Sequence, residues 1–185
     1  ILNSDSRLSY NKMSWMLNRK VKVRGEVFFT VQKGNKFTVK TSTAEIAVLG
    51  TSFNVFAREE EVKVHCFTGK VSVTNRSHNR KTVILTPGKE TKVLSRRQPL
   101  NPMDFDVEKG ARWRIGEFYF SNDRITKVLN EVERQYMIRI EYHGDTNRFY
   151  TGYFTNRNLS EALDLICTPM NLTYEKKGNT ININQ

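Results

Sequence analysis

The sequence predicts two domains of different class: an all-β domain over residues 1–103 and a small α+β domain over residues 113–185. Three observations predict this division. Short runs of alternating apolar and polar residues fill the first half, an acidic stretch with prolines follows, and an internal repeat occupies the last part. Alternation with a period of two is typical of half-buried strands, whereas each copy of the repeat contains a helical pattern.

Valine carries most of the alternation in the first half, as at Val21 and Val23 or at Val62 and Val64. Turn signals separate the runs; they are Gly34-Asn35, Gly50-Thr51, Thr68-Gly69 and Pro87-Gly88. Short strands at this spacing indicate a sandwich, a barrel or a solenoid, and the periodicity does not choose among the three.

The clearest corner lies at residues 48–55. Two apolar residues lead into Gly50, two small hydroxyl residues follow, and Phe53 and Val55 then share one face of the next strand. Because glycine adopts backbone angles that other residues avoid, we interpret Gly50 as a structural bend and not as a reactive site.

Residues 104–112 are predicted to be a linker. Pro99 and Pro102 restrict the backbone just before it, Asp104 and Asp106 add acidic charge, and Gly110 follows. Such a change of composition is typical of a boundary between domains.

The repeat predicts two βαβ units. Phe120-Ser121-Asn122 aligns with Phe154-Thr155-Asn156, and each copy continues as a polar turn, an amphipathic helix and a strand. Asn158, followed three residues later by Glu161, is typical of a helix N-cap. Each helix has one apolar stripe at i, i+3, i+4 and i+7, made by Ile125, Val128, Leu129 and Val132 in the first copy and by Leu159, Ala162, Leu163 and Ile166 in the second.

The net charge of +11 comes from the first domain. Residues 1–103 carry 19 Lys+Arg and 7 Asp+Glu, whereas residues 104–185 carry 11 and 12. The basic residues are spread over many short segments and do not cluster on one helix beside aromatic platforms, so we expect no nucleic-acid partner. A solvated basic surface is the favoured interpretation, and an anionic envelope surface is the alternative partner.

The sequence predicts no enzyme, no metal site and no cofactor. His65 and Cys66 are adjacent, but neighbours on a strand point to opposite faces and cannot form a thiol–base dyad. Glu59-Glu60-Glu61 is interpreted as a solvated acidic loop, because a cation site needs further oxygen ligands. Cys66 and Cys167 fall in different domains and are expected to be small buried residues without a disulfide.

The best candidate for a binding site is the stretch from Phe149 to Phe154, in which Tyr150 and Tyr153 complete a set of four aromatics around Gly152. Alternation puts Phe149 and Tyr153 on one face and Tyr150 and Phe154 on the other. One face covers the helices, and the other would form an interaction surface if its strand were exposed. The alternative is that all four rings are core, and Trp113 and residues 118–120 present the same choice in the first copy.

Several motifs together resemble the periplasmic region of the FecR family. They follow the family's order and are Gly25-Glu26-Val27, Phe37-Thr38-Val39, the corner with Gly50 and Phe53, Gly69-Lys70-Val71, Leu85-Thr86-Pro87-Gly88 and Trp113. Lys36 replaces the family's usual proline, and Cys66 stands where Thr or Val is expected. The second domain resembles the STN module through Gly152, Leu159, Ala162-Leu163, Leu172-Thr173-Tyr174 and Ile181-Asn182-Ile183.

FecR-family proteins are inner-membrane anti-sigma regulators paired with TonB-dependent outer-membrane receptors. The resemblance implies a solenoid-like or rolled stack of short strands for the first domain and a monomeric chain in the periplasm. It also implies two partners: the signalling domain of a receptor, and an extracytoplasmic-function sigma factor reached through a cytoplasmic segment and a membrane helix preceding residue 1. An envelope polymer-binding or structural module that uses the basic β-domain is the alternative function.

Overall fold

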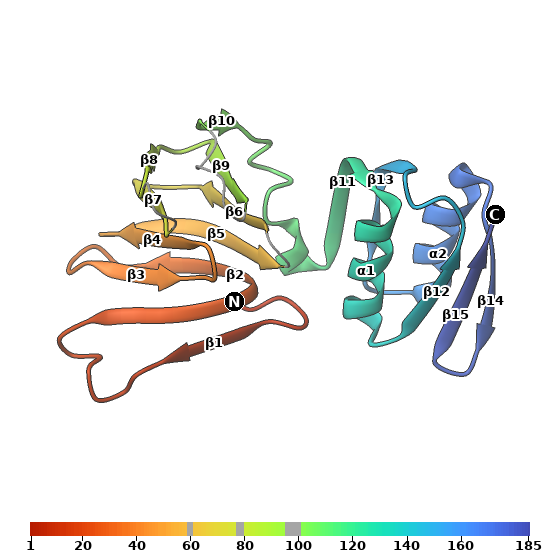
Figure 1. Cartoon of the computed structure of the whole chain (residues 1–185), viewed down its shortest axis with the longest axis horizontal. Coiled ribbons are helices and arrows are strands. Elements are labelled where there is room, and N and C mark those ends of the chain that lie inside the picture. The colour runs from red at the N-terminus through yellow and green to blue at the C-terminus, as the bar shows by residue number, and fades with distance from the viewer. Residues whose placement is uncertain (59–60, 77–79, 95–100) are drawn as a thin grey trace. The chain divides into compact units, whose positions relative to one another are not determined.

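The computed structural model describes residues 1–58, 61–76, 80–94 and 101–185 and divides the chain into two compact units, Ile1–Ala111 and Arg112–Gln185 (Figure 1). Glu59, Glu60 and Pro99, which figured in the predictions above, lie outside the described residues. Most described elements are strands, and the described part of the chain holds two α-helices, neither of which is long and apolar enough to cross a membrane.

The described residues of the first unit form one curled sheet of ten strands in the order β10-β9-β6-β5-β2-β3-β4-β7-β8, with β1 paired to β2. All neighbours are antiparallel except β2 and β3. The strands are β1 (Arg7–Tyr10), β2 (Arg19–Val31), β3 (Phe37–Lys40), β4 (Ala44–Val48), β5 (Thr51–Arg58), β6 (Glu61–Cys66), β7 (Val71–Asn75), β8 (Thr82–Leu85), β9 (Lys89–Leu94) and β10 (Met103–Asp104).

Glycine corners curl this sheet. β2 pairs with β3 before Gly25 and with β5 from Gly25 onward, and Gly25 itself has a φ of +98°. Three more corners connect the two halves of the sheet: Gly50 between β4 and β5, Gly69 between β6 and β7, and Pro87-Gly88 between β8 and β9. The Gly34 amide donates to the Leu49 carbonyl at 2.8 Å, and the Phe67 amide donates to the Ser52 carbonyl at 2.9 Å. Successive corners are therefore held against one another by main-chain hydrogen bonds.

The predicted alternation of valine builds a single core inside the curl. Val39, Val55 and Val64 are fully buried, and so is Phe53, whose ring stacks on Phe29 at 5.1 Å between centroids. Cys66 also faces this core and is buried as predicted. Curling the sheet forms a core because each strand has one apolar face, and bending brings these faces into contact.

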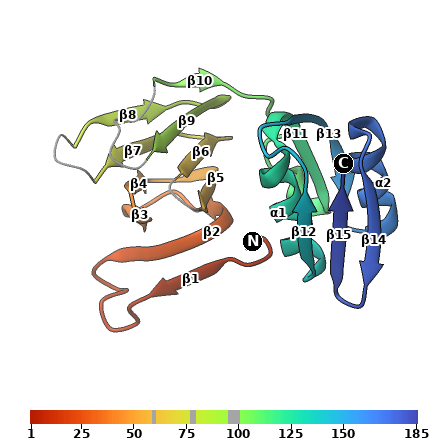
Figure 2. The same cartoon turned by 45° about the vertical axis from the view of Figure 1, so that its right-hand side comes forward.

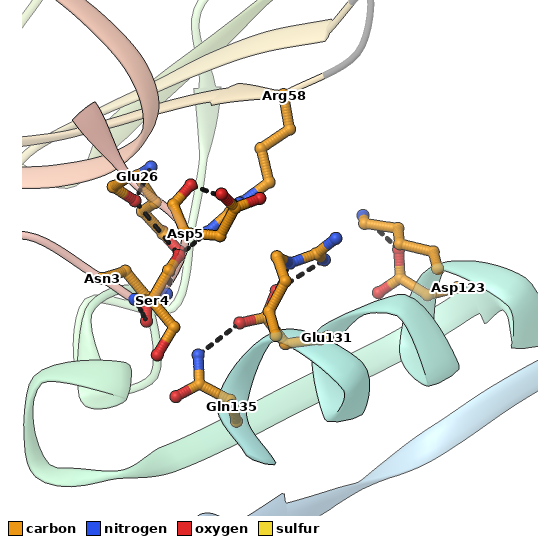
Figure 3. Close-up of polar contacts among 11 residues, drawn as sticks. Asn3, Ser4, Asp5, Glu26, Arg58, Asp123, Glu131 and Gln135 are labelled. Atoms are coloured by element: carbon orange, nitrogen blue, oxygen red, sulfur yellow. Dashed lines mark hydrogen bonds and ion pairs between the residues drawn. The ribbon is translucent and has the colours of Figure 1, made fainter. Parts of the chain in front are cut away.

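Polar groups, some buried and some half-buried, fix the N-terminal segment to the sheet (Figure 3). The carboxylate of Glu26 accepts from the amides of Asn3 and Asn54, both at 2.8 Å. The guanidinium of Arg58 donates to the main-chain oxygens of Ser4 at 2.7 Å and Asp5 at 3.2 Å. Buried charges are tolerated where such partners satisfy them.

The segment that the sequence suggests as a linker packs on the first unit. Asp104 lies in β10, which pairs with β9, and the Phe105 ring stacks on His65 at 4.6 Å between centroids. Ala111, at the end of this segment, is buried. Acidic residues and prolines suggest a solvated connection, but Phe105 within them supplies the apolar contact that holds the segment down.

The second unit has two small sheets. β11 pairs antiparallel with β13, and β12, β15 and β14 form a second sheet in that order (Figure 2). Its elements are a 3-10 turn η1 (Arg112–Ile115), β11 (Glu117–Arg124), α1 (Ile125–Tyr136), β12 (Arg139–His143), β13 (Phe149–Thr155), α2 (Leu159–Cys167), a 3-10 turn η2 (Thr168–Met170), β14 (Thr173–Lys177) and β15 (Thr180–Asn184).

This pairing differs from the prediction of two βαβ units. The order strand, helix, strand occurs twice, and α2 and β14 begin at the positions of the second copy that correspond to the starts of α1 and β12. However, the two strands of one copy lie in different sheets, because β11 pairs with the equivalent strand β13 of the other copy. The helices share one core with both sheets, so neither copy forms a closed unit of its own.

The helix stripes are buried as the periodicity predicted. Ile125, Val128, Leu129 and Val132 of α1 are buried, as are Ala162, Leu163 and Ile166 of α2, while Leu159 is half-buried. The predicted N-cap of α2 is confirmed, since Asn158 Oδ1 accepts from the amides of Ser160 at 2.9 Å and Glu161 at 3.3 Å. On α1, Glu131 accepts from Arg134 and Gln135, both at 2.7 Å (Figure 3).

Candidate functional site

The four candidate aromatics of the second unit lie on β13 and divide between its two faces. Tyr150 and Phe154 are 3% and 0% exposed and belong to the core, whereas Phe149 and Tyr153 are 51% and 46% exposed. The local packing explains why residue 152 is a glycine: a side chain there would clash with the Tyr150 hydroxyl. This hydroxyl donates to the Leu165 carbonyl at 3.2 Å. The rings are therefore core on one face of the strand and exposed on the other.

β11 extends the exposed face with a residue that the sequence marked only as ambiguous. Tyr119 lies directly opposite Tyr153 in the antiparallel register, and the two rings stack at 5.7 Å between centroids. Tyr119 is 38% exposed. On the other side of the same ribbon, Phe118 stacks on Phe154 inside the core at 4.9 Å. We call Tyr119, Phe149 and Tyr153 the outer aromatic face.

A charged pair borders the outer aromatic face. Oε2 of Glu117 accepts from Nε of Arg112 at 2.5 Å and from the Tyr119 hydroxyl at 3.0 Å, and the Arg112 guanidinium lies 5.9 Å from the centre of the Tyr119 ring. The hydrogen bond to Arg112, followed by that to Tyr119, lowers the pKa of Glu117. The hydrogen bond to Glu117 raises the pKa of Tyr119, so the phenol stays protonated and presents a neutral amphipathic ring.

A bulge interrupts the ribbon near one end. The register shifts between Phe120 and Asp123, and Asn122 adopts a left-handed φ of 52°. The Asn122 amide donates to Thr151 Oγ1 at 2.8 Å instead of to a ladder carbonyl. Bulges of this kind interrupt regular pairing and re-aim side chains. Tyr119 and Tyr153 lie opposite each other on the regular part of the ribbon, whereas Phe149 lies beyond the bulge, opposite Arg124.

The other residues named from the sequence do not join this site. Gly25, Gly50, Phe53, Gly69, Pro87 and Gly88 lie in the first unit, where they form corners or core. Trp113 lies in η1 and packs half-buried against the core of the second unit.

The side chains of His65 and Cys66 lie on opposite faces of the sheet, as the alternation predicted. Cys66 faces the core, where burial raises the pKa of its thiol to about 11, whereas His65 faces Glu90 and Phe105. Among the described residues, no group of three His, Cys, Asp or Glu side chains could hold a metal ion.

Two features were not predicted from the sequence. One is the cluster of His65, Glu90 and Phe105, which joins strands far apart in the chain and has no local motif. The other is the strong exposure of Met13, Met16 and Leu17 in the loop between β1 and β2. Four apolar residues within five positions (Met13, Trp15, Met16 and Leu17), next to basic residues, were the signal available for this loop.

Both units of the chain match known protein families. The family model described as "FecR protein" matches residues 1–72, and the model described as "FecR, C-terminal" matches residues 117–183. No curated protein sequence matches the chain.

Two crystal structures described as a "putative anti-sigma factor" from Parabacteroides distasonis ATCC 8503 have the same fold. One has a TM-score of 0.86 at 28% identity and covers 98% of this chain and 87% of its own. The other has a TM-score of 0.88 at 28% identity and covers 100% of this chain and 88% of its own. Since the two family models together span about three quarters of the residues, the chain belongs to the FecR family and has an anti-sigma regulatory role.

Proposed function

We propose that this chain is the sensing part of a FecR-type regulator and that its second unit binds the signalling domain of a TonB-dependent receptor. The event would occur in the periplasm and would be relayed to an extracytoplasmic-function sigma factor. The outer aromatic face is the observation that carries the proposal, because it combines exposed rings with a two-stranded ribbon on which a partner can lie.

The outer aromatic face has the composition of a binding surface. Tyrosine supplies a large rigid contact area at low cost in conformational entropy, and aromatic residues are enriched at the centres of interfaces. The stack of Tyr119 on Tyr153 holds both rings in place before a partner arrives. Glu117 already satisfies the Tyr119 hydroxyl, so covering this ring leaves no donor without an acceptor.

The ribbon also provides main-chain groups. Within the described part of the chain, β11 and β13 pair with each other and with no further strand. On β13 the carbonyls of Tyr153 and Thr155 already accept from the hydroxyls of Tyr150 and Tyr136, so β11 is the edge that we propose for pairing. Addition of a strand at such an edge supplies affinity through main-chain hydrogen bonds, while side-chain contacts supply specificity. A small α+β signalling domain with its own edge strand fits this mode.

The place of this event in a signalling pathway rests on the family. FecR-type regulators are membrane-anchored and have periplasmic regions. The resemblance of the second unit to STN modules, which also occur on the receptor side, supports the pairing of two related modules. We expect the chain to act as a monomer within a membrane-anchored regulator of this family.

The proposal is tested by titrating the 185-residue chain with isolated receptor signalling domains in a calorimeter. Binding should weaken about thirtyfold or more in the double variant Tyr119→Ser/Tyr153→Ser, which removes the centre of the surface. Met137→Asn is the matched control: Met137 is 84% exposed in the same unit and sits at a left-handed helix C-cap that favours Asn. Full affinity in the double variant, or equal losses in both, would reject the outer aromatic face as the receptor site.

A further inference from the structure

The loop between β1 and β2 presents apolar side chains to solvent. Residues 11–18, which we call the hairpin tip, lie at the end of the β1–β2 hairpin, on the side of the first unit away from β10 (Figures 1 and 2). Met13, Met16 and Leu17 are 93%, 91% and 86% exposed. Any one of these side chains alone would need no explanation, but three within five residues form an apolar projection of the kind that marks an interaction site.

Hydrogen bonds within the hairpin tip fix its backbone, and this backbone conformation keeps the three apolar side chains exposed. Asn11 Oδ1 accepts from the amides of Met13 at 2.9 Å and Ser14 at 3.3 Å, and the Ser14 carbonyl accepts from the Asn18 amide at 2.7 Å. The Trp15 ring points inward, 5.0 Å from Tyr10 and 6.4 Å from Phe37 between centroids. Anchoring by Trp15 leaves its apolar neighbours on the outside.

Basic residues surround the hairpin tip. Lys12 belongs to it, and Arg19 and Lys20 follow it directly at the start of β2. Arg19 pairs with Phe37 of β3 and donates to the Asn35 carbonyl at 3.2 Å, which brings the loop of residues 32–36, with Lys33 and Lys36, to the same end of the sheet.

Acidic residues are nearly absent from this part of the chain. Residues 6–44 contain nine Lys or Arg and one acidic residue, Glu26. The carboxylate of Glu26 is held by Asn3 and Asn54, remote from the hairpin tip in the strand register. The surroundings of the apolar projection therefore carry an excess of positive charge.

We propose that the hairpin tip docks on the surface of an anionic lipid bilayer. Met13, Met16 and Leu17 enter the boundary between headgroups and acyl chains, and Lys12, Lys20 and Lys36 contact the phosphates. An apolar projection surrounded by basic residues suits such an interface, because apolar burial and attraction to anionic headgroups both contribute to the free energy of membrane binding. The contact would fix the orientation of the first unit on the membrane, a role separate from receptor binding by the second unit.

Vesicle flotation of the full chain tests this. We expect binding to vesicles that mix phosphatidylcholine with anionic phosphatidylglycerol, and little binding to pure phosphatidylcholine. The triple variant Met13→Ser/Met16→Ser/Leu17→Ser should lower the partition coefficient at least tenfold. Lys12→Gln and Lys36→Gln should each lower it about fivefold at low salt, the effect expected for one basic residue at an anionic surface.

The matched control is Ile84→Thr. Ile84 is 53% exposed in β8, at the opposite end of the strand order from β10 and away from β1, so its loss should leave vesicle binding unchanged. The single variant Met16→Ser gives a second test if the triple variant does not fold. With Trp113→Phe in the background, Trp15 is the remaining tryptophan, and its emission should shift to the blue on binding anionic vesicles.

Three results would overturn the proposal. The first is equal binding of the triple variant and the unmodified chain, which would assign the attraction to charge alone. The second is equal binding to neutral and anionic vesicles. The third is a concentration-dependent dimer in sedimentation that the triple variant abolishes, which would make the hairpin tip a contact between two copies of the chain.

Discussion

Nε2 of His65 lies 2.8 Å from Oε2 of Glu90, and the other ring nitrogen, Nδ1, lies 3.1 Å from the carbonyl oxygen of Gly110. His65 is on β6, Glu90 on β9, and Gly110 at the end of the segment that leads to the second unit. The Phe105 ring covers the imidazole at an interplanar angle of 12°. One side chain therefore joins two strands and the connecting segment, and when the ring is doubly protonated both nitrogens donate.

The first prediction concerns pH. Burial alone raises the pKa of Glu90, but the hydrogen bond and charge of His65, together with the charges of Lys63 and Lys92, outweigh it, so the pKa lies below its usual value of 4.5. A carboxyl whose pKa is depressed on folding stabilises the fold above its unfolded pKa, and this stabilisation is lost as the pH falls through the folded pKa. Stability of the first unit should therefore decline below about pH 4.5.

Glu90→Gln should remove most of this decline. The variant is expected to be less stable than the unmodified chain at neutral pH and to approach it in acid, as measured by urea unfolding across the acid and neutral range. Glu45→Gln is the control, because Glu45 lies 3.8 Å from Lys40 in a half-exposed pair that contributes little. Parallel curves for Glu90→Gln and the unmodified chain would contradict the prediction.

The second prediction separates two reasons for glycine at a corner. Gly69 and Gly88 have similar φ values of +72° and +80°. A Cβ at Gly69 would lie 2.6 Å from the Gly50 carbonyl oxygen, whereas at Gly88 the nearest atom is 4.0 Å away. Gly88→Ala should therefore cost about 1 kcal/mol for the left-handed backbone alone, and Gly69→Ala about 2–4 kcal/mol because the neighbouring corner is also displaced.

Urea unfolding of the two alanine variants measures this difference. Gly50→Ala should fall between them: a Cβ there would lie 2.6 Å from Cα of Lys33, but no positive φ is required. Equal costs at Gly69 and Gly88 would mean that the stacked corners move apart freely.

The third prediction concerns the thiols. Cys66 and Cys167 are buried, and burial raises the pKa of each to about 11, with Asp164 adding to the effect at Cys167. Because the thiolate is the reactive form, neither should react with an aromatic disulfide reagent at mildly alkaline pH in the native chain, and both should react in concentrated guanidinium. Rapid labelling of one thiol under native conditions would reveal local opening of its unit.

Much of the fold follows from local patterns in the sequence. Val39, Val55 and Val64 alternate with polar residues, so the strands and their buried face were predictable. The stripe from Ile125 to Val132 indicated the first helix in the same way. The position of Gly50 marked a corner, but the reason differs from the expected backbone angles: no positive φ occurs there, and a Cβ would lie 2.6 Å from Cα of Lys33.

The pairing of strands was not predictable, because it depends on contacts between residues far apart. Nothing within one copy of the repeat says that Tyr119 lies opposite Tyr153, so the aromatic stretches of the two copies could be recognised but not joined. Alternation correctly divided Phe149 and Tyr153 from the other two rings of the stretch, but which face is outside depended on where the helices pack. The contact of the Phe105 ring with His65, on a strand distant in sequence, is likewise not predicted by any local pattern.

The repeat supplies the last prediction, since it places two different residues at the same helix position. Asn158 precedes α2 and caps it through two hydrogen bonds, whereas Arg124, at the equivalent position of the first copy, precedes α1 and makes no side-chain cap. Asn158→Ala should destabilise the second unit by about 1 kcal/mol, because two amides of the first turn lose their acceptor. Arg124→Ala should cost less than half of this, because no cap is lost and one exposed basic side chain is removed from the positive end of a helix dipole.

The reverse substitution, which introduces a capping residue before α1, completes the comparison of the two helix starts. Arg124→Asn gives α1 the residue that α2 uses, and the backbone at Arg124 already has an extended ψ of 137°, which suits an N-cap. It should stabilise the second unit by about 0.5–1 kcal/mol, measured as a rise in the urea midpoint of that unit with an unchanged slope. A loss of stability in Arg124→Asn would show that Arg124 contributes through contacts other than the cap, and that the two halves of the repeat have diverged in how their helices begin.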